Sequence, residues 1–240
     1  MKMVRPFWYL APLLLLVAGL GFQAAEQEEE IWLPPVTIET LDNGLKVIVI
    51  ERRRLPIVHI TVSLQAGSIF DPREKSGLAE FTANMLTEGT EIRTADQIAE
   101  EIDFVGGSLF ATAGVDTASV TTRVLTKDLD VGLDLLADVL LHPTFPEDEM
   151  EIVRNRMVGG VKFRRDDPGS LASVHLRHVL FGADHPFGYV ESEETVNAVT
   201  RADLVDFYGR YYRPGGSTLV VAGDVEREDI IARILERLGP

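Results

Sequence analysis

The chain has 240 residues, of which 45% are hydrophobic and 25% charged, a composition typical of a folded protein with one large domain or two small ones. Its formal net charge of −15 argues against a nucleic-acid partner, because a phosphate backbone requires a basic surface. The absence of cysteine excludes disulfides and thiolate metal ligands, so any metal would need histidine or carboxylate ligands.

The N-terminus has the pattern of a secretory signal. Lys2 and Arg5 precede an apolar run that ends at Phe22, and small and acidic residues follow. The run is short for a membrane-spanning helix, which needs about 20 residues. The small residues Ala24 and Ala25 form an imperfect cleavage site. Both a cleaved signal and an uncleaved anchor therefore remain open.

These observations predict three parts of the chain. Residues 1–25 are expected to be a signal peptide or an uncleaved anchor, and residues 26–35 an acidic linker that contains proline. Residues 36–240 are expected to form the folded domain, because periodic hydrophobic patterns begin there and continue to the C-terminus.

Strand patterns come in pairs. Asp42-Asn43-Gly44 separates two β-rich runs, which predicts a hairpin because its turn needs a positive φ. Apolar and polar residues alternate from Ile57 to Leu64, so this strand has one buried face and His59 lies on its polar face. Residues 108–125 predict two strands around Gly114, and residues 217–225 a buried strand.

Helix patterns fill most of the remaining chain. Thr94 and Gln97 form a capping box at the start of a helix that is expected to end at Gly106-Gly107. Thr200 is expected to cap another helix. Further helices are expected over residues 127–141, 146–165, 170–181 and 230–238. Because strands come as hairpins and helices come in groups, we expect an α+β fold, a mostly antiparallel sheet with helices packed on it.

Five strings in order, "LDNGLKVIV", "QAGSIFDPREKSGLAEFTANMLTEGT", "RRDDPG", "HPFG" and "YYRPGGSTLVVAGDV", resemble the N-terminal domain of the pitrilysin/insulinase family of zinc metallopeptidases. The resemblance covers nearly everything from about Val36 to the C-terminus. It implies that the domain is one half of a two-domain module.

Active members of that family carry an HxxEH motif on the helix after the "GSxxDP" loop. Two histidines four residues apart share one helix face and bind zinc, and the glutamate acts as general base. A further glutamate on a later helix completes the metal shell. By resemblance, these positions are Glu80, Ala83, Asn84 and, for the distal glutamate, Gly159.

These four residues predict that the site is degenerate, with no catalytic or metal-binding residue. Glu80 offers a single usable carboxylate, the amide oxygen of Asn84 is a poor zinc ligand, and Gly159 has no side chain. Ala83 cannot accept a proton, so the general base is missing. For Gly159-Gly160 we expect close packing of this helix against the helix of Glu80, since two glycines inside a helix cost about 1 kcal/mol each.

A rival metal site would use His175 and His178, which lie near each other on one predicted helix face. Glu191, Glu193 and Asp184 are the candidate further ligands, and the alternative is an ordinary half-exposed polar stripe. The remaining histidines have structural interpretations: His142 ends a helix and complements its dipole, and the "HPFG" string around His185 is similar to a structural turn of the family.

The resemblance implies a non-catalytic, peptidase-like subunit with no cofactor of its own. Such subunits form a heterodimer with an HxxEH-bearing zinc subunit and help to enclose or recognise a peptide. A separate C-terminal half is a further expected partner, since the chain stops where the first half would end. The protein is expected to be exported and periplasmic, or anchored to the inner membrane, with membrane contact only through an uncleaved N-terminal segment. Two alternatives remain open: a zinc metalloendopeptidase with an atypical ligand set, and a structural scaffold unrelated to proteolysis.

Overall fold

A computed structural model of the chain describes residues 34–239. The predicted signal or anchor and most of the predicted linker lie outside the described residues. From Pro34 onward the chain packs as one unit.

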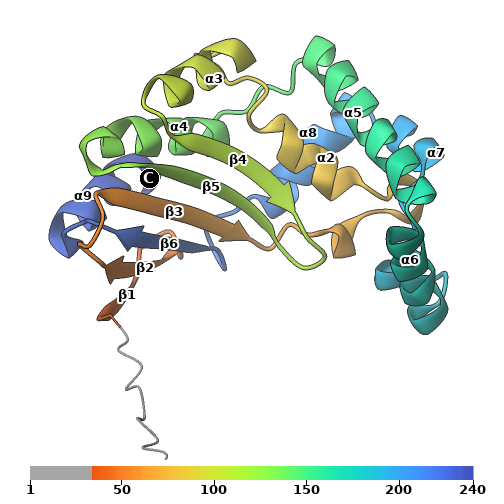
Figure 1. Cartoon of the computed structure of the whole chain (residues 1–240), viewed down its shortest axis with the longest axis horizontal. Helices are drawn as coiled ribbons and strands as arrows, with labels where there is room; N and C mark the ends of the chain where they lie inside the picture. Colours follow the sequence, from red (N-terminus) through yellow and green to blue (C-terminus); the bar gives the residue numbers. More distant parts are fainter. Residues whose placement is uncertain (1–33, 240) are drawn as a thin grey trace, which may run out of the picture. The chain divides into compact units, whose positions relative to one another are not determined.

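One six-stranded sheet organises this unit (Figure 1). The strands follow the order β1-β2-β6-β3-β5-β4, in which β2 and β6 are parallel and all other neighbours are antiparallel. The expected α+β fold with a mostly antiparallel sheet is therefore confirmed. The strands are β1 (Val36–Thr40), β2 (Lys46–Glu51), β3 (Ile57–Leu64), β4 (Ser108–Ala113), β5 (Ala118–Leu125) and β6 (Thr218–Gly223).

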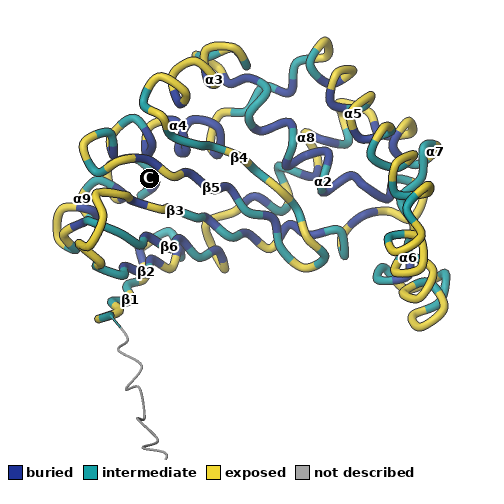
Figure 2. Tube along the Cα trace, viewed as in Figure 1, coloured by how far each residue is buried: buried dark blue, intermediate teal, exposed yellow. Residues whose placement is uncertain are grey.

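The alternation of the sequence sets which face of the sheet is buried. In β3, Val58, Ile60 and Val62 are at most 1% exposed, whereas His59 between them is exposed, as predicted for a polar-face residue. The same alternation runs across β2 and β6, and Figure 2 shows it as buried and less buried positions along each strand. The buried face is apolar because period-2 patterns direct every second side chain to it.

Helices cover that apolar face. Helices α2, α3, α4 and α9 contact the sheet: α2 and α4 at β4 and β5, α3 at β4, and α9 at β2. The helices are α2 (Leu78–Met85), α3 (Ala95–Phe104), α4 (Leu129–Leu141), α5 (Glu147–Asp166), α6 (Pro168–Phe181), α7 (Glu193–Asn197), α8 (Arg201–Tyr211) and α9 (Arg227–Leu238), with short 3₁₀ turns at Ser68–Phe70, Arg73–Lys75, Thr126–Asp128 and Pro186–Gly188.

Local signals place several helix ends where the sequence predicts them. Thr94 and Gln97 form the expected capping box of α3, and His142 is the residue at which α4 ends. Helix α6 begins at Pro168, earlier than predicted, because the Asp167 side chain accepts a hydrogen bond from the Ser170 backbone and proline is tolerated in the first turn.

Candidate functional site

The candidate site, which contains the HxxEH positions, begins at the N-terminus of α2. The buried Asp71 carboxylate accepts hydrogen bonds from the backbone N–H groups of Gly77 (2.8 Å) and Ala79 (2.9 Å). These N–H groups have no partner within the helix, so Asp71 satisfies them from outside. Gly77 has a φ of +104°, a conformation that favours glycine.

The three α2 positions of the HxxEH pattern lie in different surroundings. Glu80 is partly buried and lines a cavity of about 280 Å³ together with residues from α5, α6 and the loop before α7. Ala83 is fully buried in the protein interior. Asn84, one turn after Glu80, is partly buried and does not line this cavity. Of the three positions, only Glu80 therefore lines this cavity.

Gly159 lies on α5 and is exposed. A Cβ atom added there would have no neighbouring atom within 4 Å, and one added at Gly160 would meet only the end of Arg164 at 3.9 Å. The expected close packing of the two glycines against α2 is therefore wrong. The reason is that α5 buries a different face, formed by Met150, Val153 and Met157.

An ion pair lies beside Glu80. Arg164, one turn beyond Gly160 on α5, donates a hydrogen bond to Glu191, and both residues line the cavity. Glu191 also lies directly against the start of α2, because a Cβ atom added to Gly77 would be 3.1 Å from Glu191 Cγ. Glu191 thus connects α5 to α2 through its charged head and its aliphatic stem.

Burial dominates the electrostatics of the two acids beside Glu80. Burial raises the pKa of Asp71 to about 7, although the backbone N–H groups of Gly77 and Ala79 act in the opposite direction. Burial and then the negative charge of Glu80 raise the pKa of Glu191 to about 7, while Arg164 lowers it. The three carboxyl groups therefore repel one another, and Arg164 partly compensates them.

The residues present do not fit a zinc ion. Zinc in a peptidase site requires three protein ligands and a general base. Here Glu80 supplies the only strong donor of the four motif positions, and the nearby Glu191 is already occupied by Arg164. Within residues 34–239, no three His, Asp or Glu side chains come together in a way that could hold a metal ion.

The rival histidine pair is divided between two environments. His178 Nδ1 donates a hydrogen bond to the carbonyl oxygen of Gly188 (2.7 Å), which occupies that side of the ring. His175 lines a neighbouring cavity of about 350 Å³ together with Glu191 and Glu193. Glu193 pairs with Lys162 (3.2 Å) and Arg165.

The other candidate residues of that pair also have structural partners. Asp184 pairs with Arg73 at 3.1 Å. His185 accepts a hydrogen bond from the backbone N–H of Phe187 at the start of the 3₁₀ turn Pro186–Gly188, in agreement with the predicted turn.

The sequence did not single out Asp71 or Arg164 as site residues. Asp71 precedes α2 by several residues, and a cap at that distance has no local pattern, unlike the Thr94–Gln97 box. Arg164 meets Glu191 across 27 positions of the sequence. A helical arginine has no sequence signal for such a distant partner.

Two family models match the chain. The model described as insulinase (peptidase family M16) matches residues 46–163, and the model described as peptidase M16 inactive domain matches residues 198–239. These ranges include α2, most of α5 and the C-terminal strand and helix.

Relatives and solved structures agree with these models. An uncharacterized zinc protease from Mycobacterium leprae is 33% identical over 83% of this chain and 45% of its own length. The crystal structure of a peptidase M16 inactive domain from Pseudomonas fluorescens has a TM-score of 0.79 and 29% identity over 84% of this chain and 50% of that one. The periplasmic protease PqqL from Escherichia coli shares the fold, with a TM-score of 0.73 and 21% identity over 85% of this chain and 24% of that one. The chain thus spans about half the length of the first relatives it matches.

Proposed function

Because the chain belongs to the insulinase family, peptidase family M16, we propose that it is a non-catalytic, peptidase-like subunit that pairs with an HxxEH-bearing zinc subunit. In this role it helps to enclose or recognise a peptide and does not cut it. The observation that carries the proposal is the combined loss of the ligands and the base at Glu80, Ala83, Asn84 and Gly159.

The surroundings of Glu80 support a site without metal chemistry. The guanidinium of Arg164 lies in the same cavity and pairs with Glu191. A fixed positive charge at this place opposes a divalent cation and replaces it as the partner of the local carboxylates. Ala83 has no titratable group and lies in the core.

The partner is a second unit of the same family. The chain spans 45% of the Mycobacterium leprae relative and 50% of the Pseudomonas fluorescens structure. A companion of similar size would complete a two-domain module, either as a zinc-binding subunit or as a separate C-terminal half. An exported, periplasmic location is part of the proposal and is supported by the name of the Escherichia coli protein with the same fold. Among residues 34–239, no helix has both the length and the apolar character needed to cross a bilayer.

A zinc endopeptidase with an atypical ligand set is the second candidate. The names of several relatives favour it, since they are described as uncharacterized zinc proteases. The zinc ligands of such an enzyme would have to be His175, Glu191 and Glu193. Both glutamates already form ion pairs.

Zinc content separates the two candidates. We expect the natural chain, purified without chelator and incubated with zinc, to retain far less than one zinc per chain by elemental analysis. The variant Glu80→His, Asn84→His, Gly159→Glu restores the family's three ligand positions, and Gly159 has open space for the longer side chain. We expect this variant to retain more zinc than the natural chain. Near-stoichiometric zinc in the natural chain would contradict the proposal.

Partner capture tests assembly and separates it from the scaffold alternative. The tagged chain is expressed in its own host, crosslinked and purified, and the recovered proteins are identified by mass spectrometry. We expect an HxxEH-bearing family member at a stoichiometric level. Recovery of a complex without any peptidase of this family would instead favour a scaffold unrelated to proteolysis.

A further inference from the structure

The loop between β2 and β3 concentrates positive charge in an acidic protein. Arg52, Arg53 and Arg54 are consecutive and exposed, in a chain whose formal net charge is −15. Arg53 pairs with Glu51 (3.3 Å) and with Glu226, the residue before α9, at 3.4 Å. Across residues 34–239, neither Arg52 nor Arg54 takes part in an ion pair. The loop therefore carries two uncompensated guanidinium groups.

Exposed aliphatic side chains surround the same loop. Leu55 is 64% exposed and follows the three arginines directly. Ile57 (37% exposed) lies opposite Leu125 (38% exposed) in the pairing of β3 with β5. Val36 (54% exposed) is the first residue of β1 and lies opposite Ile50 of β2. Ile50 precedes Arg52 by two residues. We call this surface, formed by Arg52–Ile57, Val36 and Leu125, the arginine edge.

Backbone hydrogen bonds hold the arginine edge in place. The Arg52 N–H donates to the carbonyl of Gly223 (2.7 Å), and the Thr126 N–H donates to the carbonyl of Pro56 (3.0 Å). The two ends of the loop are thus fixed to β6 and to the turn that follows β5. A fixed loop loses little conformational entropy on binding, so its charged and apolar side chains are arranged in advance.

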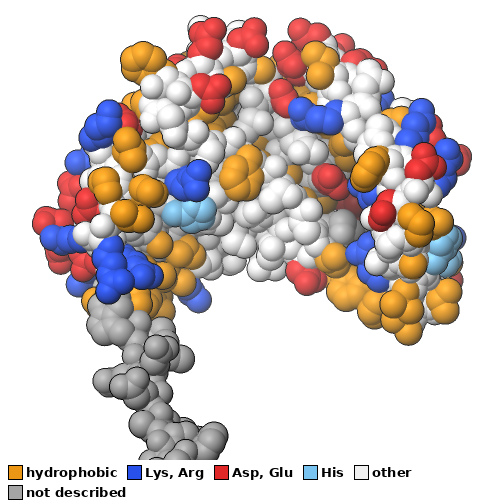
Figure 3. Space-filling model, in the orientation of Figure 1, with side chains coloured by type: hydrophobic (Ala, Val, Ile, Leu, Met, Phe, Trp, Pro, Cys, Tyr) orange, Lys and Arg blue, Asp and Glu red, His pale blue; other side chains and the backbone are white. Residues whose placement is uncertain are grey.

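Among the described acidic residues near this edge, Asp224 beside Ile57 takes part in no ion pair, whereas the others are neutralised or lie to one side. Glu39 pairs with Arg227, and Asp128 pairs with Lys127 at 3.5 Å. Figure 3 shows basic and hydrophobic side chains gathered around the β1–β3 end of the sheet, with the acidic ones towards α9. Because exposed charges are screened over about 8 Å at physiological salt, the distant acidic surface contributes little at the arginine edge.

We propose that the arginine edge rests on the surface of a bilayer that contains anionic phospholipid. Arg52 and Arg54 contact the lipid phosphates, and Leu55 inserts at the boundary of the acyl chains. Guanidinium groups match phosphate geometry, and adjacent aliphatic side chains add burial of apolar area. The chain before Pro34 contains the apolar run that ends at Phe22 and then the acidic residues of the predicted linker, and it leads into β1, whose first residue Val36 belongs to this edge.

The absence of cysteine in the chain allows a direct test. Leu55→Cys in the full chain creates a single thiol, which is labelled with the environment-sensitive dye NBD. Phe104→Cys on α3, where the side chain is 92% exposed, is the matched control. Each labelled protein is mixed with phosphatidylcholine vesicles with and without phosphatidylglycerol.

We expect a blue shift and increased NBD emission at position 55 only when phosphatidylglycerol is present, and no change at position 104. The response is expected to disappear in 1 M NaCl, where the screening length falls to about 3 Å. An equal response to both vesicle types would overturn the proposal, because apolar insertion alone would then explain it. A response at position 104 that matches the one at position 55 would overturn it too.

Charge variants complete the test. In the labelled protein, Arg52→Gln with Arg54→Gln is expected to weaken the response to phosphatidylglycerol vesicles about 30-fold. Arg156→Gln with Arg165→Gln on α5 removes the same charge elsewhere and should change binding less than about twofold. Equal weakening by both pairs would overturn the assignment to the arginine edge, and circular dichroism of each variant checks that it is folded.

Discussion

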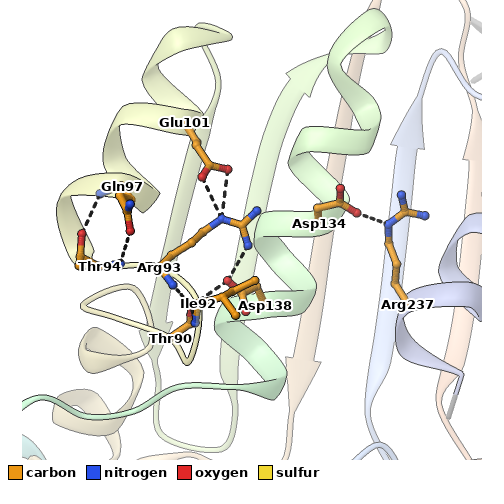
Figure 4. A network of polar contacts seen from close by, with 9 residues as sticks. All are labelled: Thr90, Ile92, Arg93, Thr94, Gln97, Glu101, Asp134, Asp138 and Arg237. Atoms are coloured by element: carbon orange, nitrogen blue, oxygen red, sulfur yellow. Dashed lines mark hydrogen bonds and ion pairs between the residues drawn. The ribbon is translucent and has the colours of Figure 1, made fainter.

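Arg93 Nη1 lies 2.7 Å from Asp138 Oδ2, and this ion pair joins the loop after α2 to the buried side of α4. Thr90 donates a second hydrogen bond to the same oxygen at 2.8 Å, and Arg93 Nε reaches Glu101 of α3 (Figure 4). The pair therefore fixes the segment that follows the candidate site to two separate helices.

Removal of Asp138 should destabilise the fold strongly. Asp138→Ala leaves the partly buried guanidinium of Arg93 without one of its two acids and Thr90 without its acceptor, so we expect a loss of about 3 kcal/mol. Asp134→Ala, on the same helix, breaks only a half-exposed pair with Arg237 and should cost less than about 1 kcal/mol. Urea denaturation of both variants measures the difference, and equal losses would contradict this account of the buried pair.

Stability should fall as the pH rises from about 4 to about 7. The pKa values of Asp71 and Glu191 are raised in the fold to about 7, so the folded chain binds more protons than the unfolded chain in this window. Their contribution is fully present below the ordinary carboxyl pKa and is lost as the pH passes the folded value. We expect each group to contribute on the order of 2 kcal/mol, measured by urea denaturation at several pH values.

Two amide variants locate the origin of this pH dependence. Asp71→Asn and Glu191→Gln each remove one titrating group and should flatten the decline. Asp116→Asn, in the exposed turn between β4 and β5, is the control and should leave the slope unchanged. A slope that stays the same in both amide variants would assign the effect to other groups.

Gly159 and Gly132 should respond oppositely to alanine. Both lie inside helices, where alanine is favoured over glycine by about 1 kcal/mol. An added Cβ meets nothing within 4 Å at Gly159, so we expect Gly159→Ala to stabilise the protein. At Gly132 the added Cβ would be 2.9 Å from Val124 Cγ2, so Gly132→Ala should destabilise it. Thermal unfolding of both variants gives the sign directly; destabilisation at position 159 would show that α5 packs there after all.

Gly77→Ala should cost about 2 kcal/mol, because φ is +104° and the added Cβ would be 3.1 Å from Glu191 Cγ. Gly106→Ala is the matched control: its φ is also positive, at +63°, but the added Cβ has open space. We expect about 1 kcal/mol there, from backbone strain alone. Chemical denaturation separates the two effects, and a cost at Gly77 no larger than at Gly106 would argue against contact between Glu191 and α2.

The sequence predicts well what is set locally. The hairpin at Gly44, the capping box at Thr94 and the alternation along β3 all appear as expected, because each depends on neighbours within a few residues. The short helix α7 was not predicted, since its capping box at Ser192 and Thr195 encloses only five helical residues.

Interactions between distant segments escaped prediction. The pairing of Arg164 with Glu191 depends on how α5 lies beside the loop before α7, which no local pattern specifies. The error at Gly159 has the same origin, because a glycine pair fits both close packing and an open surface. The absence of zinc ligands at positions 80, 83, 84 and 159 remains a prediction from residue identity.

The place of β6 has a consequence for how the chain folds. This strand enters the sheet between β2 and β3, parallel to β2, and its partners in β2 precede it by more than 170 residues, as in the pairing of Lys46 with Thr218. Until residue 218 is available, β2 and β3 each lack their inner neighbour and the sheet is split in two. Strand pairings between residues so far apart in the sequence form slowly, because the chain loses the entropy of loop closure before the new contacts compensate for that loss. The domain therefore reaches its native state only after β6 has been made, and a chain shortened before β6 exposes two unpaired strand edges that promote aggregation.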